Sequence, residues 1–412
     1  MTSPRASTGS QAPPRAVGVV VIGGGQAGLA TSYWLRRAGI DHVVLDDAEQ
    51  PGGAWARMWP SLHAFSPPQY SSLPGWLMPG WTGEGAFPSR AHVEEYLRAY
   101  EERYEVPVQR PVRVEAVRHG DGERLVVDGH RLVDGSSDGQ AVSWEARAVV
   151  SATGTWSRPF WPSVPGMREF RGVQIHSADY RGPDSLPPGR VLVVGGGNTG
   201  AQLAAELTAS HEVVWATRRA PRFMPPEVDG RVLFDVATAR RAALDAGRED
   251  DGGVAALGDI VQVPEVRRSL AEGRLGAVPM VERLTASGAV WGAAPGQAPD
   301  GSTWNHPPAA AGEEFSLDAV VWCTGHRAAL GHIRPLGVRD ERGRVPVAQG
   351  SMRGRPGSRG CTSWGTATGP ARRRRRSSGW GGRHGPRCGR SPTCWGERSG
   401  LSTGLGAGHG GR

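Results

Sequence analysis

The sequence predicts an α/β fold with two Rossmann-like dinucleotide-binding domains, the second inserted into the first. Two glycine-rich fingerprints, Gly23 to Gly28 and Gly195 to Gly200, each follow an apolar run and open a helical pattern. A third apolar run, Asp318 to Thr324, lies far downstream and is expected to return the chain to the first domain. A chain that leaves one such domain, builds another and comes back has the topology of an insertion.

Length and composition fit a multidomain protein without a membrane segment. The 412 residues suffice for two or three hydrophobic cores. No apolar stretch reaches the roughly 20 residues that span a bilayer, and residues 1–15 form a Pro-rich lead without the apolar part of a secretory signal. We therefore expect a disordered lead over 1–15 and a cytoplasmic protein that does not engage a membrane. Cys323 is the sole cysteine before residue 349, so neither a disulfide framework nor a metal site is expected.

The first fingerprint lies in a predicted strand–helix–strand unit, with strand 17–22, helix 26–38 and strand 42–45. Its glycines allow a tight turn, close approach of a pyrophosphate and close packing of helix on strand. The start of the helix offers free N–H groups to the phosphates. Asp46 ends the second strand, where it can accept hydrogen bonds from a ribose. The expected binding residues here are Gly23, Gly25, Gln26, Ala27, Gly28 and Asp46.

The second fingerprint repeats this pattern with strand 191–194, helix 198–209 and strand 212–216. Its second strand ends at Arg218 and Arg219 and lacks an acidic residue. A guanidinium binds a 2′-phosphate and a carboxylate repels it, so this end favours NADPH over NADH. The alternative is a solvated basic edge. The expected binding residues are Gly195, Gly197, Asn198, Thr199, Gly200, Arg218 and Arg219.

Between the fingerprints lies the pattern F-x-G-x-x-x-H-x-x-x-Y, formed by Phe170, Gly172, His176 and Tyr180. With it, residues 16 to 348 resemble the flavin-containing monooxygenases. The resemblance implies FAD at the first fingerprint, with the G-G-x-W segment and two Thr-Gly strand ends beside it, and NADPH at the second. The additional residues implied for the FAD site are Gly53, Trp55, Thr153, Gly154, Thr324 and Gly325.

The resemblance also implies the domain organisation and the chemistry. The expected segments are a lead (1–15), an FAD domain (16–155), an inserted NADPH domain (156–315), a return to the FAD domain (316–348) and a basic tail (349–412). NADPH would reduce FAD, and a flavin hydroperoxide formed with O2 would oxygenate a small soft nucleophile. The partners are thus a small-molecule substrate and O2, with no nucleic acid, and a homodimer is left open.

Single positions refine this resemblance. Tyr180 fits the branch that oxygenates nitrogen or sulfur, since Baeyer–Villiger members carry Trp there. Residues 65–76 are similar to a bacterial subgroup associated with arsenical-resistance operons, but Ser66 and Pro67 stand where relatives often place an asparagine beside the flavin. His176 can either hold the linker between the domains or act in the chemistry. The resemblance implies that the cofactors carry the chemistry, so no catalytic acid or base is assigned.

Three other functions stay open. A disulfide reductase needs paired cysteines, and Cys323 stands alone. A non-oxygenating NADPH oxidase or flavin reductase shares every cofactor motif. A flavin-free, catalytically inactive remnant is the third, because of the tail.

The tail differs in composition from the rest of the chain. Residues 351–412 contain thirteen arginines and one glutamate, so they supply the net charge of +8, and they have too few large apolar side chains to fold. Arg372 to Arg376 lack the interleaved aromatics of a nucleic-acid module, and an accidental basic run is favoured. In a shifted reading frame the codons from Cys361 onward permit an apolar strand, a Gly-Asp turn and a helix, with which such flavoproteins usually close the FAD domain. We therefore hypothesise a frameshift between about residues 346 and 360.

Overall fold

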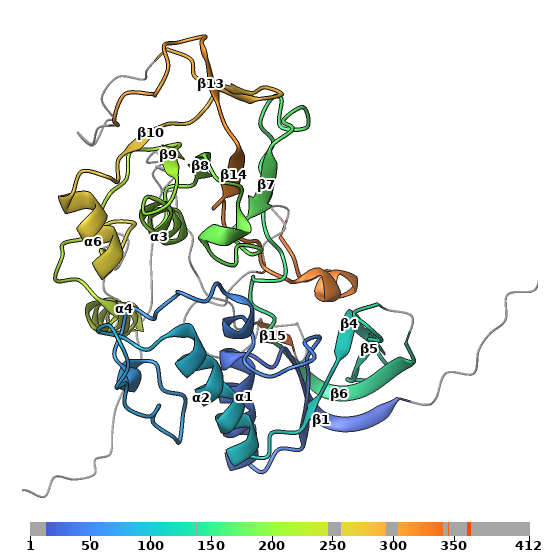
Figure 1. The fold of residues 1–412 in the computed structure, drawn as a ribbon. Helices are drawn as coiled ribbons and strands as arrows, with labels where there is room; N and C mark the ends of the chain where they lie inside the picture. The colour runs from blue at the N-terminus through green and yellow to red at the C-terminus, as the bar shows by residue number, and fades with distance from the viewer. Residues whose placement is uncertain are drawn as a thin grey trace, which may run out of the picture. The chain divides into compact units, whose positions relative to one another are not determined.

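The computed structural model describes residues 14–136, 139–245, 257–293, 304–340, 345 and 361–363. In these ranges the strands form three sheets, and the two larger sheets carry the two glycine turns (Figure 1). Both contain parallel neighbouring strands with helices after them, so the predicted α/β class is confirmed. Contacts group every described element in one compact unit.

The first sheet has seven strands in the described ranges. Its main order is β3 (Val108–Gln109), β2 (His42–Leu45), β1 (Arg15–Ile22), β6 (Ala141–Ser151), β5 (Leu125–Arg131) and β4 (Val112–His119). β1 pairs in parallel with β2 and β6, whereas β4, β5 and β6 form an antiparallel meander. β1 begins at Arg15, which pairs with Trp144, so the expectation of a disordered lead is wrong for this residue, and residues 1–13 lie outside the described residues.

Two helices accompany this sheet. They are α1 (Gln26–Arg37) and α2 (Arg90–Arg103), and the segment between β2 and α2 is irregular apart from the short 3-10 helices η1 (Trp55–Arg57) and η2 (Pro68–Tyr70). The Ser89 hydroxyl caps α2 by accepting the His92 N–H, which fixes where the helix starts. Tyr96, Leu97 and Tyr100 of α2 pack in one buried cluster with Leu29 of α1. This packing fixes α2 beside the first glycine turn.

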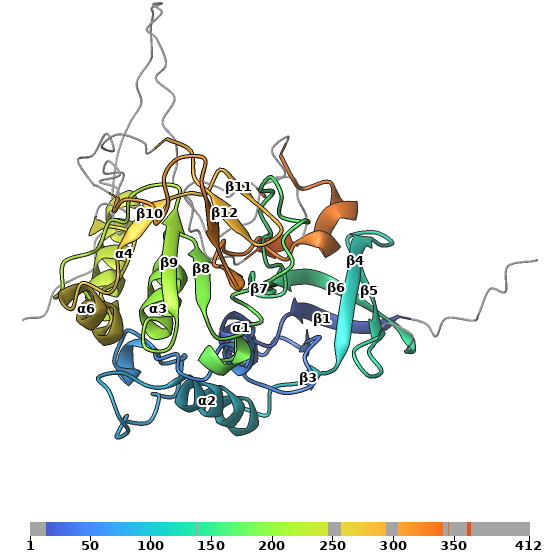
Figure 2. The ribbon, with the colours of Figure 1, turned by 45° about the horizontal axis from the view of Figure 1, so that its top comes forward.

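The second sheet has five strands among the described residues, in the order β10 (Ala277–Pro279), β9 (Glu212–Thr217), β8 (Arg190–Val194), β14 (Ala319–Trp322) and β7 (Val173–His176). All four pairings in it are parallel. Figure 2 shows α3 (Asn198–Leu207) lying along β8 and β9. The further elements are η3 (Pro183–Ser185), α4 (Gly230–Asp245), α6 (Pro264–Ala271) and a small sheet of β11 (Arg283–Leu284), β12 (Gly288–Val290) and β13 (Glu314–Ser316).

The return to the first domain comes later than expected. The predicted boundary at residue 316 is wrong, because β14 pairs with both β8 and β7 and is therefore a central strand of the second sheet. The chain rejoins the first sheet at η4 (Gly331–Leu336), where Ile333 and Leu336 pack in the core beneath β4 and β5. An apolar run cannot by itself reveal which of two parallel sheets accepts it.

The tail contains one strand that the composition did not predict. β15 (Cys361–Ser363) pairs in parallel with residues 149–151 of β6. β5 pairs with β6 only up to Ala146, so the second half of β6 offers free main-chain groups on that side. Such an edge accepts a strand through its backbone whatever the side chains, so the expectation that no part of 349–412 folds is wrong for these three residues. The rest of that expectation lies outside the described residues.

Candidate cofactor-binding site

The first glycine turn has room for a pyrophosphate. A Cβ on Gly28 would lie 1.8 Å from the Gly23 carbonyl oxygen, and Gly23 has a φ of +108°, so both must be glycine for the turn to close. A Cβ on Gly25, by contrast, would meet only the Cα of Gly53, at 3.9 Å. No side chain caps α1 at Gly25, so its first N–H groups are free for an anion.

The G-G-x-W segment, Gly52 to Trp55, lies against this turn although it comes after α1 and β2 in the sequence. Gly53 packs so close that a Cβ on it would be 2.8 Å from the Cα of Gly25. The Trp55 indole N–H donates to the Gln26 side-chain oxygen over 3.1 Å. The structure therefore brings together two motifs that the sequence assigned to one cofactor. Ala27 is exposed in the first turn of α1 beside them.

Asp46 lies at the end of β2, buried, with one carboxylate oxygen 3.3 Å from the Ala48 N–H. Its other oxygen faces Arg110, whose guanidinium also binds Glu101 of α2. The sequence analysis missed Arg110 and Glu101. One signal could have found Arg110. It is a charged residue directly after β3, a short strand that ends at Gln109 and pairs with β2.

The second turn has the same construction. A Cβ on Gly200 would lie 2.1 Å from the Gly195 oxygen, and one on Gly197 would meet no atom within 4 Å. The Asn198 side chain is engaged in the fold, because its oxygen accepts the Val261 N–H over 2.8 Å. Thr199 stands beside it in the uncapped first turn of α3. This turn also has space and free N–H groups for a phosphate.

Arg218 and Arg219 directly follow β9, and both are exposed. Within the described ranges neither side chain has a hydrogen-bond or ion-pair partner. Arg190 and Arg222 of the same domain, in contrast, each pair with an acidic residue. Two unengaged guanidinium groups beside the second turn are available for an anionic ligand.

The two Thr-Gly strand ends form hydrogen bonds between the two segments that connect the first and second sheets, residues 153–160 and 324–329. The Thr153 hydroxyl donates to the Ala329 carbonyl oxygen over 2.9 Å, and the Thr324 hydroxyl donates to the Phe160 oxygen. Main-chain bonds join the same stretches, since Ala329 N–H donates to Gly154 O and Phe160 N–H to Gly325 O. Both glycines have a positive φ, +59° and +77°. The structure thus uses both threonines to tie residues 153–160 to 324–329.

His176 is completely buried, and both of its ring nitrogens contact backbone groups. Nδ1 accepts the Ala178 N–H over 3.1 Å, so Nε2 carries the proton and donates to the Gly325 oxygen, also over 3.1 Å. Burial lowers the pKa of His176, and the nearby His326 lowers it further. A neutral imidazole with both nitrogens engaged favours the linker role over a direct part in the chemistry.

The other residues of the motif are structural as well. Phe170 is buried in the core of the second sheet, and a Cβ on Gly172 would collide with its ring and with the Asp318 oxygen. Tyr180 is fully buried in the cluster that also contains Trp59, and burial raises the pKa of its hydroxyl. Trp59 belongs to the segment after the G-G-x-W motif, so the motif tyrosine packs where that segment meets the second sheet's core.

The segment that departs from the resembling family lies against α4. The Gly230 N–H donates to the Phe65 oxygen over 2.6 Å, and a Cβ on Gly230 would lie 2.4 Å from the Cβ of Ser66. The rings of Tyr70 and Phe234 meet edge to face at 5.7 Å. Ser66 itself bonds to the Ser71 hydroxyl over 3.0 Å. Residues 65–70 and the first turns of α4 therefore form one surface of the protein.

Comparison with known proteins places this arrangement in a family. Residues 20–237 match the family model of pyridine nucleotide-disulphide oxidoreductases. The structure of a flavin-containing monooxygenase from Stenotrophomonas maltophilia is 42% identical in sequence and matches with a TM-score of 0.65, over 81% of this chain and 86% of that one. This chain belongs to the flavin-containing monooxygenases. Members of this family use FAD and NADPH, and the chain is an oxidoreductase of that type.

Curated relatives match a shorter part of this chain. The uncharacterized oxidoreductase CzcO of Bacillus velezensis is 32% identical over 215 residues, 52% of this chain and 59% of the relative. The probable indole-3-pyruvate monooxygenase YUCCA8 of Arabidopsis thaliana is 30% identical over 224 residues, 53% of this chain and 51% of the relative. The match thus spans little more than half the length of either relative.

Two further features concern the buried cysteine and the hydrophobicity of the helices. Burial raises the pKa of the Cys323 thiol to about 12, and the thiol is enclosed by the second sheet. A thiol of this kind is unreactive, which argues against the disulfide reductase alternative. None of the helices in the described ranges has the length and hydrophobicity to span a bilayer.

Proposed function

We propose that this chain uses NADPH and FAD to transfer one oxygen atom from O2 to a small soft nucleophile, a nitrogen or sulfur centre. The observation that carries the proposal is the pair of glycine turns, each with an uncapped helix and open space at its middle glycine. The first would hold the pyrophosphate of FAD and the second that of NADPH. Tyr180 at the end of the family motif supports nitrogen or sulfur as the centre oxygenated.

The protein's own part is to bind and orient. When bound, FAD and NADPH supply the hydride transfer and the activation of oxygen. The free N–H groups of α1 and α3 would bind the phosphates, Asp46 would accept from the ribose of FAD, and Trp55 and Gly53, which pack against the first turn, would contact the same cofactor. Arg218 and Arg219, exposed beside the second turn, would bind the 2′-phosphate that distinguishes NADPH from NADH. No side chain is assigned as an acid or a base.

Replacing Arg218 with alanine tests the assignment of the second site. A charge-assisted hydrogen bond is worth roughly 1.5–3 kcal/mol, so Arg218→Ala should raise the KM for NADPH by about tenfold to a hundredfold. The KM for NADH should change by less than about twofold, because NADH lacks the phosphate. Steady-state kinetics with both nucleotides gives the two values, and equal effects on both would contradict the proposal.

A non-oxygenating NADPH oxidase is distinguished by its product. Oxygenation of an organic sulfide probe should yield one sulfoxide for each NADPH consumed, measured by mass spectrometry beside nucleotide absorbance. Release of peroxide in step with NADPH consumption, with no sulfoxide, would identify the oxidase.

The second candidate function, an inactive remnant, is favoured by one observation on the tail. In the described residues β15 pairs with β6 over three residues, and it starts at Cys361, the point from which the shifted frame permits an apolar strand. This coincidence supports the proposed frameshift. Sequencing the DNA around codon 350 tests it, and the flavin absorbance of the purified chain shows whether FAD is retained with the tail as written. A closed alternative frame would rule the frameshift out.

A further inference from the structure

We infer that Arg110 is a positioning residue for FAD: held by Glu101 of α2, it orients the Asp46 carboxylate toward the ribose of the cofactor's adenosine. The inference rests on the proposed FAD site at the first glycine turn. Arg110 and Glu101 lie outside the glycine fingerprints, the G-G-x-W segment and the motif between the fingerprints.

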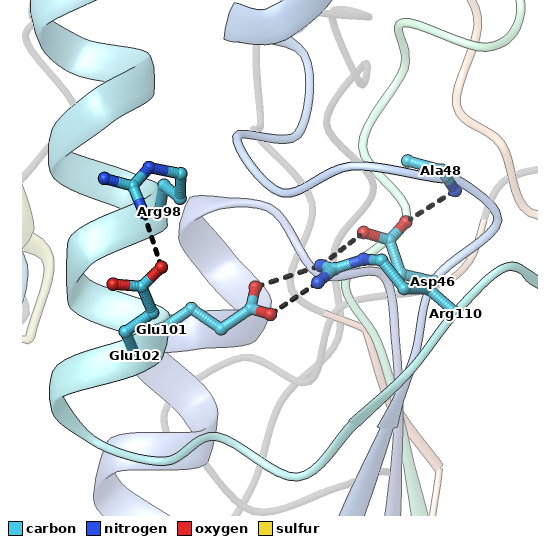
Figure 3. Close-up of polar contacts among 6 residues, drawn as sticks. All are labelled: Asp46, Ala48, Arg98, Glu101, Glu102 and Arg110. Atoms are coloured by element: carbon cyan, nitrogen blue, oxygen red, sulfur yellow. Dashed lines mark hydrogen bonds and ion pairs between the residues drawn. The ribbon is translucent and has the colours of Figure 1, made fainter.

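The three side chains form a nearly enclosed chain of charges from α2 to the end of β2 (Figure 3). Arg110 Nη2 donates to Glu101 Oε2 over 2.9 Å and to Asp46 Oδ2 over 3.2 Å, and Nη1 donates to Glu101 Oε1. The side chains of Arg110, Asp46 and Glu101 are 14%, 10% and 16% exposed. Ion pairs this enclosed are screened far less than surface pairs.

The chain of charges ends at the glycine turn. A Cβ on Gly24 would lie 2.5 Å from Asp46 Oδ2 and 3.0 Å from Arg110 Nη2. The carboxylate and the guanidinium therefore both lie against the loop that wraps the dinucleotide. Asp46 Oδ1 is oriented from the other side by the Ala48 N–H at 3.3 Å.

Glu101 decides how Arg110 meets Asp46. An arginine and a single carboxylate prefer two parallel hydrogen bonds, which would occupy both oxygens of Asp46. Here Glu101 takes that paired geometry, and Asp46 receives one hydrogen bond from the guanidinium. Acceptor sites on Asp46 thus stay available for ribose hydroxyls. Burial lowers the pKa of Arg110, but the hydrogen bonds and charges of Glu101 and Asp46 outweigh it, and the net shift is upward.

The experiment measures FAD affinity of apoprotein by titration, together with an FAD analogue that lacks the adenosine 2′-hydroxyl. In the wild type the analogue should bind about tenfold more weakly than FAD, because it lacks one hydrogen bond to Asp46. Glu101→Gln and Arg110→Lys should weaken FAD binding by about tenfold and reduce the difference between FAD and the analogue to about twofold. The matched control is Glu102→Gln, which breaks the exposed pair with Arg98 on the same helix (Figure 3) and should leave both values within twofold.

The possible results separate this inference from the proposed function. If wild type binds FAD and the two variants keep the full tenfold difference between FAD and the analogue, Arg110 and Glu101 act only on the fold and the inference is overturned. If wild type binds no FAD, the proposed function fails and the inference with it. Should Arg110→Lys not fold, Glu101→Gln alone decides, because it keeps the shape and one hydrogen-bond acceptor of the side chain.

Discussion

Gly25 and Gly197 mark the same position in the two turns, and a methyl group at either would enter open space. Both have ordinary extended dihedrals, φ −82° and −112°, so alanine fits the backbone there without strain. We expect Gly25→Ala to weaken FAD binding by about tenfold or more and leave NADP⁺ binding unchanged, and Gly197→Ala to do the reverse. Calorimetric titration of each variant with both ligands measures this.

Gly28→Ala is the contrasting control for that prediction. Its Cβ would lie 1.8 Å from the Gly23 oxygen, so this variant should lose thermal stability, whereas Gly25→Ala and Gly197→Ala should melt within a few degrees of wild type. If Gly25→Ala binds FAD as the wild type does, the open space at the first turn is not the pyrophosphate position.

At the scale of elements, η4 returns the chain to the first sheet through a buried histidine. The His332 Nε2 lies 3.0 Å from the Ser151 hydroxyl of β6, and the side chain is 5% exposed. Burial lowers the pKa of His332 to about 4, and the charge of Arg339 lowers it further. The folded protein therefore holds this imidazole neutral at pH values where the unfolded chain, with a pKa near 6.5, is protonated.

The free energy of unfolding should consequently fall as the pH drops from about 6.5 to about 4, because the unfolded state binds the extra proton in this window. The contribution of His332 is about 3 kcal/mol over the window. His332→Gln should flatten the dependence between these pH values even if it lowers stability at pH 7. Denaturant unfolding at a series of pH values measures the slope, and an unchanged slope in the variant would assign the effect to other groups.

At the scale of the whole molecule, the insertion means that the chain passes between the two sheets twice. Thr153 and Thr324 each donate a hydroxyl hydrogen bond to the other connecting segment, and His176 holds the second segment through Gly325 O. The two passages therefore behave as one hydrogen-bonded junction.

A double-mutant cycle tests this junction. Thr153→Val and Thr324→Val keep the shape of the side chain and should each lower the free energy of unfolding by about 1 kcal/mol. In combination they should deviate from additivity by at least about 0.5 kcal/mol, as contacts in one network do. Strict additivity would mean that the two segments are held independently.

Much of this organisation follows from local sequence signals. Two strand–turn–helix units could be predicted from the glycines at 23, 25 and 28 and at 195, 197 and 200, because few other residues satisfy the steric requirements of that turn. The predicted bounds of the helices and strands in these units agree with the structure to within a few residues. The family resemblance followed from the same fingerprints and the motif between them.

Other features were decided only by tertiary structure. The sheet that β14 joins, the edge of β6 that accepts β15, and the meeting of Glu101, Arg110 and Asp46 all depend on contacts between residues distant in sequence. The hydrophobicity of a strand predicts that the strand is buried, but it does not predict which neighbouring strand it pairs with. A charged residue meets its ion-pair partner only when the two elements that carry them pack together. The two glycine turns that we propose for the phosphates could therefore be predicted from the sequence, whereas the contacts of the side chains that we propose to orient the ribose were set by how α2 packs beside β2.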